Sequence, residues 1–383
     1  MRTVSAMHHL FSMPLSRRRW LSLYPALLFS AVPARADNPI RIGQSAEIQG
    51  LASENRSGAL LYFEQINQRG GIHGRPLELI SYDDQRLPEK ARANTLKLIR
   101  EDRVTALFGY RSTATVEAVI PLLEQYQIPL IAPFSGAQSL HQKGKGYIFH
   151  LRASYHDEAA RMGDMLQRMQ MQRIMTVTQD DSFGQDGLAG FQLQLNRLQI
   201  QPLQQLKYSR QDTQLNQIIA AIISQQPQAV MMACTPSACL RIMKQVLASG
   251  QRPQFLMLSN VSSQQFYSEL GDPGRGIGVT QVMPYPQDIG VPLVREFHKA
   301  IRQFKAGMPA SYASLEGYAA AKLLCEGLKR CVTELTASQL MSALESMPAT
   351  DLGGLQISYS KKNHAGSSFA ELTILGKNGT VVR

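Results

Sequence analysis

Residues 41–84 have the sequence RIGQSAEIQGLASENRSGALLYFEQINQRGGIHGRPLELISYDD, and this stretch decides the fold. Its apolar residues form a short strand that breaks at Gly43, recur at helical spacing from Ala59 to Ile66, and form a second strand over Leu77–Ser81. Gly70 and Gly71 end the helix, where a positive φ is needed. The stretch therefore predicts a βαβ unit.

The same alternation continues along the rest of the chain. Strands are expected at Thr105–Gly109 and Pro129–Phe134, with a helix over Ser112–Tyr126 between them. A second series is expected after Arg152, with helices at 157–169, 187–198, 214–225 and 238–249, and strands at 173–178, 229–233 and 254–258. A strand at 277–285 and helices at 291–306 and 314–330 follow. Alternating strands and helices predict two α/β lobes, each with a parallel sheet covered on both faces.

Two segments carry a family resemblance: QINQRGGIHGRPLELISYDD at 65–84 and LFGYRSTATVEAVIPLLEQYQIPLIAPFSGA at 107–137. They resemble periplasmic binding proteins of the branched-chain amino acid type. The resemblance implies a type I periplasmic binding protein fold with two Rossmann-like lobes and a three-segment hinge near Leu151, Met283 and Ala349. It assigns 37–151 with 284–348 to the first lobe, and 152–283 with 349–383 to the second.

The first 36 residues have the features of a cleavable export signal. A basic segment ends in Arg17–Arg18–Arg19, an apolar core of about a dozen residues follows, and Ala34–Arg35–Ala36 is a small-x-small cleavage site. A membrane span needs roughly 20 apolar residues. We therefore expect cleavage after Ala36 and a periplasmic protein, exported by the general or the twin-arginine route.

The net charge gives no support for a nucleic-acid partner. Loss of the leader removes five arginines and no acid, which lowers the formal charge from +11 to +6. The remaining basic residues form short dispersed groups such as His141–Lys145 and Lys361–Lys362, without a basic face interleaved with aromatic residues.

All four cysteines fall in two close pairs, Cys234 with Cys239 and Cys325 with Cys331. In an oxidising compartment this pairing suggests two local disulfides. The alternative is that Cys234 and Cys325 are small buried apolar residues. A zinc site is disfavoured because no histidine lies at ligand spacing beside either pair.

The segment Gly109–Thr113 is the first candidate binding loop. A strand ends there and a helix begins, so backbone N–H groups, the positive end of the helix dipole and the hydroxyls of Ser112 and Thr113 converge. That combination suits a ligand carboxylate. The alternative is that Ser112 or Thr113 only caps the helix.

Two further loops are candidates by resemblance. Phe134, Ser135 and Gly136 follow the next strand at the same carboxyl edge, where open α/β sheets bind ligands. In the family this loop offers a carbonyl and a hydroxyl, and Gly136 occupies the hydroxyl position here. In the second lobe, Phe183 corresponds to an aromatic ring that closes over the ligand side chain; its alternative role is to anchor the following helix.

The loop at Leu258–Asn260 lacks the acid with which amino-acid binders pair the ligand ammonium, and offers Ser259 and Asn260 instead. A buried ammonium without a carboxylate costs several kcal/mol. The ligand therefore need not carry an α-ammonium, unless Glu47, which is otherwise a solvated loop acid, supplies the charge. Tyr318 corresponds to an aromatic residue facing the cleft, although it can equally be a packing residue.

These observations predict a monomeric solute-binding protein that closes on an amino acid or related carboxylate and delivers it to an inner-membrane ABC permease. No cofactor or metal is expected, and no nucleic acid. The first alternative is a ligand-sensing module of the same fold that feeds a receptor. The second is a periplasmic enzyme, but the sequence contains no Gly-x-Ser-x-Gly, His-Glu-x-x-His or Walker motif.

Overall fold

The computed structural model describes residues 38–143, 146–209, 215–331, 334–377 and 380–382. The expected leader, residues 1–36, lies outside the described residues. Within the described residues, no helix has the length and apolar character needed to cross a membrane.

The first lobe is built on a five-stranded parallel sheet of order β2-β1-β3-β4-β5. Ile40 pairs with Leu77, which confirms the βαβ unit predicted from residues 41–84. The positive φ of Gly70 (94°) and Gly71 (74°) ends its helix as expected. The strands are β1 (Ile40–Ser45), β2 (Leu77–Tyr82), β3 (Ala106–Phe108), β4 (Leu130–Ile131) and β5 (Ile148–Phe149).

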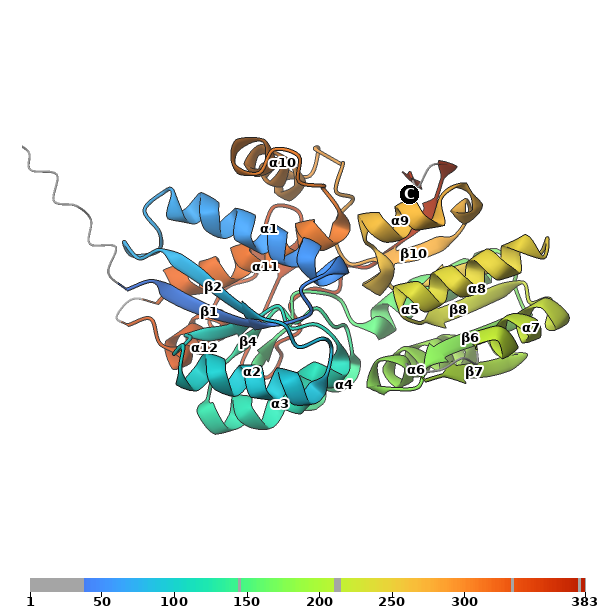
Figure 1. The fold of residues 1–383 in the computed structure, drawn as a ribbon, viewed down its shortest axis with the longest axis horizontal. Helices are drawn as coiled ribbons and strands as arrows, with labels where there is room; N and C mark the ends of the chain where they lie inside the picture. Colours follow the sequence, from blue (N-terminus) through green and yellow to red (C-terminus); the bar gives the residue numbers. More distant parts are fainter. Residues whose placement is uncertain (1–37, 144–145, 210–214, 332–333, 378–379, 383) are drawn as a thin grey trace, which may run out of the picture. The chain divides into compact units, whose positions relative to one another are not determined.

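Helices cover both faces of this sheet (Figure 1). Alternate residues of β3 face opposite ways, so Phe108 packs in the core beneath α1 and α11 while Leu107 packs in the core beneath α2 and α3. The helices α1 and α11 cross closely at Gly58, because this residue has no side chain. A Cβ at this position would lie 1.8 Å from the Ser314 carbonyl oxygen. The helices are α1 (Gly50–Asn67), α2 (Pro88–Arg100), α3 (Thr113–Tyr126), α4 (Gln138–Lys143), α10 (Pro292–Phe304), α11 (Tyr312–Lys329) and α12 (Ala337–Glu345).

The second lobe is built on a seven-stranded sheet of order β14-β13-β10-β9-β8-β6-β7. Its strands β7, β6, β8, β9 and β10 are parallel, and β13 and β14 are added antiparallel. The strands are β6 (Ile174–Gln179), β7 (Gln204–Tyr208), β8 (Ala229–Ala233), β9 (Gln254–Met257), β10 (Gly278–Gln281), β13 (Glu371–Leu375) and β14 (Val381–Val382).

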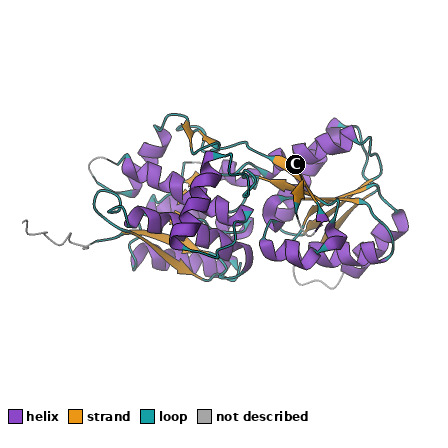
Figure 2. Cartoon of the chain, turned by 90° about the horizontal axis from the view of Figure 1, so that it is seen from above, coloured by secondary structure: helices purple, strands orange, loops and turns teal. Residues whose placement is uncertain are grey.

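The second sheet also lies between two helical layers (Figure 2). Val230 and Met232 of β8 pack with the residues of α7, α8 and α9, whereas Met231 packs on the other face with α5 and α6. The helices are α5 (Tyr155–Arg168), α6 (Ser182–Arg197), α7 (Leu215–Gln225), α8 (Pro236–Ala248) and α9 (Gln264–Leu270), with short 3₁₀ turns at Ser259–Val261 and Asp272–Gly274.

The chain passes between the two sheets three times: between β5 and α5, between β10 and α10, and before β13. The third crossing differs from the expected position near Ala349. Leu352, Leu355 and Ile357 pack in the core of the first lobe, and the short pair β11 (Thr350–Asp351) and β12 (Gln356–Ile357) lies there too. The crossing therefore comes after Tyr359, because these apolar side chains have their burial partners on the first sheet.

Candidate ligand-binding site

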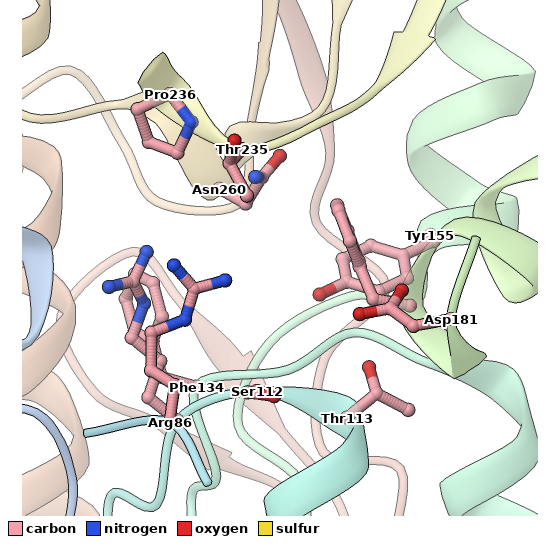
Figure 3. A pocket seen from close by; sticks show the side chains of 11 residues that line it. Arg86, Ser112, Thr113, Phe134, Tyr155, Asp181, Thr235, Pro236 and Asn260 are labelled. Carbon is pink, nitrogen blue, oxygen red and sulfur yellow. The ribbon is translucent and has the colours of Figure 1, made fainter. Parts of the chain in front are cut away.

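One cavity is lined by residues from the carboxyl edges of both sheets (Figure 3). Ser112 and Thr113 lie at the start of α3, and Thr235 and Asn260 lie opposite them. The lining comprises Arg86, Arg111, Ser112, Thr113, Phe134, Tyr155, Asp181, Phe183, Thr235, Pro236 and Asn260. The expected residues Ser112, Thr113, Phe134, Phe183 and Asn260 are thus brought together around one cavity.

The start of α3 has unusual geometry. Ser112 has φ 85° and ψ 136°, and its side chain makes no capping hydrogen bond. The Ser112 side chain therefore does not cap the helix, which was the alternative role considered for it. Thr113 is fully buried, and its hydroxyl lies 2.9 Å from that of Ser135. A non-glycine residue at this φ is strained, and such strain concentrates at functional sites.

Three aromatic rings form the apolar part of the lining. Tyr155 and Phe183 meet edge to face, with ring centroids 5.3 Å apart. Phe134 lies on the other side and its ring stacks on the Arg152 guanidinium, 4.7 Å from the ring centroid. Burial raises the pKa of Tyr155, so its hydroxyl stays a neutral hydrogen-bonding group.

Two arginines border this cavity and a neighbouring one of about 430 Å³. Arg111 forms an ion pair with Glu47, and the Arg86 Nε lies 3.8 Å from the same carboxylate. Burial lowers the pKa of Arg86, while the charge of Asp181 opposes this shift. Glu47 therefore neutralises two arginines and lines the neighbouring cavity, and its role as a partner for a ligand ammonium stays a prediction.

The second-lobe side offers hydrogen-bond acceptors. Asp181 Oδ1 accepts from the backbone N–H of Gly184 at 3.0 Å and so caps α6. Asn260 Nδ2 donates to the Cys234 carbonyl at 2.8 Å, and this contact fixes the orientation of the amide. Its Oδ1 is buried and has no hydrogen-bond partner within the described chain. Asn260 therefore keeps one acceptor for a ligand N–H group.

Three expected contacts lie behind the cavity instead of in its lining. Ser135 is buried against Thr113, and the Gly136 carbonyl accepts from the Tyr155 N–H at 2.7 Å. The Ser259 hydroxyl donates to Glu158 at 2.9 Å. Each of these groups is satisfied by the protein, so each supports the lining from outside.

Ser259 belongs to a buried ion network behind Phe134. Arg152, which is 1% exposed, hydrogen-bonds to Ser259 and pairs with Glu316 at 3.5 Å and with Glu158 at 3.9 Å. Burial raises the pKa of Glu316 to about 7, although Arg152 opposes the shift. The network joins α11 of the first lobe to α5 of the second.

Tyr318 is also not part of the cavity. Its ring is fully buried in the first-lobe core, and its hydroxyl donates to Gln65 at 2.7 Å and lies 3.2 Å from Glu296. Tyr318 is therefore a packing residue, because it lies on the side of α11 that faces α1 and α10.

The four cysteines are free and buried, so the expected disulfides are absent from the structure. Cys325 lies in α11, whereas Cys331 follows the end of that helix at Lys329, and the two thiols are not joined. Cys234 lies beside Cys239 but donates to the Val177 carbonyl at 3.2 Å. All four thus serve as small buried side chains.

Several lining residues were not predicted from the sequence. Arg111 lies inside the candidate loop Gly109–Thr113, and Asp181 lies two residues before Phe183. Polar side chains at a strand end were a usable signal for both. Arg86 and Tyr155 come from segments with no motif, and only the tertiary fold brings them to the cavity.

A model of the family described as periplasmic binding proteins matches residues 39–378. The chain belongs to this family. The solved structure of a possible leucine/isoleucine/valine-binding protein from Rhodopirellula baltica is 29% identical, has a TM-score of 0.86, and is matched over 92% of this chain and 98% of that one.

Curated relatives of this periplasmic binding protein are amino acid binding proteins, and they include binding proteins of the branched-chain type. An amino acid binding protein of Pseudomonas aeruginosa is 22% identical over 272 residues, which are 69% of this chain and 72% of the relative. The Leu/Ile/Val-binding protein of Escherichia coli is 22% identical over 308 residues, or 80% and 83% of the two chains. The fold is therefore the type I periplasmic binding protein fold that the resemblance implied.

Proposed function

We propose that this periplasmic binding protein binds an amino acid or a closely related small carboxylate between its lobes and delivers it to an inner-membrane ABC permease. The observation that carries the proposal is the start of α3. The Ser112 hydroxyl makes no capping bond and lines the cavity beside Thr113. Hydroxyls and helix N-terminal N–H groups together suit a carboxylate.

The opposite side of the cavity supports an amino group on the ligand. The loop at 258–260 contains no acid, but Asp181 lines the cavity and Asn260 Oδ1 is a buried acceptor with no partner among the described residues. This arrangement supports an ammonium on the ligand, which the sequence alone did not require. We propose that the amino group lies toward Asp181 and Asn260, with the apolar body between Phe134 and Phe183.

Lobe closure follows from this division of contacts. The first lobe supplies the carboxylate-binding groups and the second supplies the acceptors, so the ligand makes its full set of contacts only when both lobes reach it. A ligand shifts an open and closed equilibrium only by its extra affinity for the closed state.

The direct test is calorimetric titration of the exported protein with amino acids, each paired with its deaminated keto acid. We expect a hit among the amino acids, and its keto acid should bind more than tenfold more weakly, a difference of about 1.4 kcal/mol. Binding only to solutes that lack a carboxylate, such as sugars, would overturn the proposal. Equal affinity for an amino acid and its keto acid would contradict the proposed contact with the ligand ammonium.

The delivery step needs its own test. Deletion of the gene should abolish uptake of the identified ligand into whole cells, and the wild-type gene should restore uptake. Normal uptake with loss of a ligand-dependent transcriptional or chemotactic response would favour the sensing alternative instead.

Export can be checked on the periplasmic fraction. Mass spectrometry should find an N-terminus at Asp37, which removes Trp20, the single tryptophan of the sequence. A mature chain that keeps Trp20 would contradict cleavage after Ala36.

A further inference from the structure

A second cavity lies where the first and third chain crossings run side by side, on residues that the ligand cavity does not use. The His150 N–H donates to the His364 carbonyl at 2.9 Å, and the Gly366 N–H donates to the His150 carbonyl at 2.9 Å. The cavity has a volume of about 40 Å³ and is lined by His141, Gly146, Ile148, His150, Lys361, Lys362, Asn363 and His364.

Three histidines line this cavity, and two of them have ring nitrogens without partners among the described residues. His150 is 1% exposed, and within the described residues neither of its ring nitrogens has a hydrogen-bond partner. The same holds for the buried Nε2 of His141. The His364 ring also lines the cavity, but it contacts Glu345 through Nε2 at 3.2 Å and the backbone of Ile148. The rings of His141 and His150 stack with centroids 3.7 Å apart.

Buried polar atoms without partners usually mark the place of a water or an ion. One water needs roughly 10–15 Å³ of such space. A cavity of about 40 Å³ therefore has room for several polar atoms, which is the scale of one small oxyanion.

The charges around the cavity decide between a cation and an anion. Lys361 and Lys362 are exposed and form part of its wall, so they repel cations and attract anions. No group of three or more histidine, cysteine or acidic residues suited to a metal ion occurs in the part of the chain that the structure describes. We propose that this cavity is a binding site for a small inorganic oxyanion of the sulfate or phosphate class, held by the three histidines and the two lysines.

The histidines link anion binding to proton uptake. Burial lowers the pKa of His150 well below its ordinary value, and His141, His364 and Arg152 lower it further. An anion beside His150 acts in the opposite direction and favours the imidazolium, which donates from both nitrogens. Anion affinity should therefore rise as the pH falls.

The other histidines have charged neighbours of their own. Burial lowers the pKa of His141, and Asp157 and Asp186 oppose the shift while His156 adds to it. Burial also lowers the pKa of His364, and Glu345, whose carboxylate lies 3.2 Å from Nε2, opposes it. These carboxylates already favour the protonated forms of His141 and His364 to some extent. Proton uptake that depends on the anion should therefore be largest at His150.

The test measures thermal unfolding in potassium sulfate against potassium chloride at equal ionic strength, at pH 6 and pH 8. Sulfate keeps its double charge over this range, so a pH dependence belongs to the protein. Because sulfate stabilises most proteins by exclusion from the surface, the comparison is between the wild type and Lys361→Ala with Lys362→Ala. Lys244→Ala, which removes an exposed lysine from α8, is the matched control.

We expect the sulfate-specific rise in Tm to be larger at pH 6 than at pH 8, and the double variant to lose at least half of it while Lys244→Ala keeps it. In NMR spectra, sulfate should shift the His150 ring nitrogens toward the protonated state. An equal sulfate response in the wild type and the double variant would overturn the proposal. So would stabilisation by Zn²⁺ that weakens at pH 6, because metal binding competes with protons.

Discussion

Two of the helices that begin at the candidate ligand cavity, α3 and α6, start in different ways. Asp181 begins α6 with extended backbone, φ −150°, and its side chain accepts from the Gly184 N–H at 3.0 Å. Ser112 begins α3 with φ 85°, and its side chain caps nothing. The second-lobe helix is therefore satisfied by its own cap, whereas the first-lobe helix keeps a hydroxyl and its first N–H groups for another partner.

This difference supports the proposal that the first lobe holds the ligand carboxylate. A satisfied helix start gains little from a ligand, while an uncapped one gains the hydrogen bonds that its own side chain does not make. The strained backbone at Ser112 points the same way, since strain of this kind persists where the surrounding structure imposes it.

Removal of both first-lobe hydroxyls should have the largest effect. Ser112→Ala with Thr113→Ala is expected to weaken ligand binding by about 100-fold or more, because hydrogen bonds to a charged group contribute roughly 1.5–3 kcal/mol each. Stability should fall by only about 1 kcal/mol, the value of the bond between Thr113 and Ser135. Calorimetry and denaturant unfolding measure the two quantities separately.

The control is a helix cap far from the cavity. Thr336 Oγ1 accepts from the Gln339 N–H at 3.3 Å and caps α12. Thr336→Ala should lower stability by about 1 kcal/mol and leave affinity unchanged. If the Ser112 and Thr113 variant behaved in the same way, α3 would be an ordinary capped helix and the contrast with α6 would fail.

The second prediction concerns the network behind Phe134. Burial disfavours the charge of Glu316 and raises its pKa in the folded protein to about 7, from an ordinary value of 4.5. The folded state thus binds more protons than the unfolded state between these values, so stability falls as the pH rises from about 4.5 to 7. The total effect is on the order of 3 kcal/mol.

Glu316→Gln should remove this part of the pH dependence. Subtracting the wild-type stability from that of the variant at each pH cancels the other titrating groups. The free energy of unfolding of Glu316→Gln should rise relative to that of the wild type between pH 5 and 8. A flat difference would mean that Arg152 keeps Glu316 charged throughout and that the pKa shift is absent.

A substitution at the start of α6 separates its cap from its charge. Asp181→Asn keeps a good N-cap and removes the carboxylate, so stability should be unchanged. Affinity for an amino acid should fall about tenfold, because a charged acceptor is worth roughly 1 kcal/mol more than a neutral one. Affinity for the matching keto acid should not fall. An equal loss for both ligands would show that Asp181 does not bind the ammonium.

The sequence predicted what is local and missed what depends on distant partners. Strand and helix periodicity fixed the order of elements around residues 41–84, and the hydroxyls at the start of α3 follow directly from that order. Ser259 looked equally available, but Glu158 lies 101 positions earlier in the chain and occupies both its N–H and its hydroxyl. Tyr155 reaches the cavity only because the first crossing directs it there.

The smallest predicted effect tests the strain at Ser112. Ser112→Gly should raise the free energy of unfolding by about 1 kcal/mol, since a positive φ costs a non-glycine residue roughly 1–3 kcal/mol and glycine loses about 0.5–1 kcal/mol more in chain entropy. The same change should weaken ligand binding, because the hydroxyl is lost. Asp181→Gly is the matched variant. It should lower stability, because φ −150° is open to any residue and the helix cap is lost, and it should lower affinity as well, because the carboxylate is lost. The decisive result is that Ser112→Gly gains stability and loses affinity, while Asp181→Gly gains no stability. This result would mean that the first lobe holds its helix start in a costly conformation that the ligand uses.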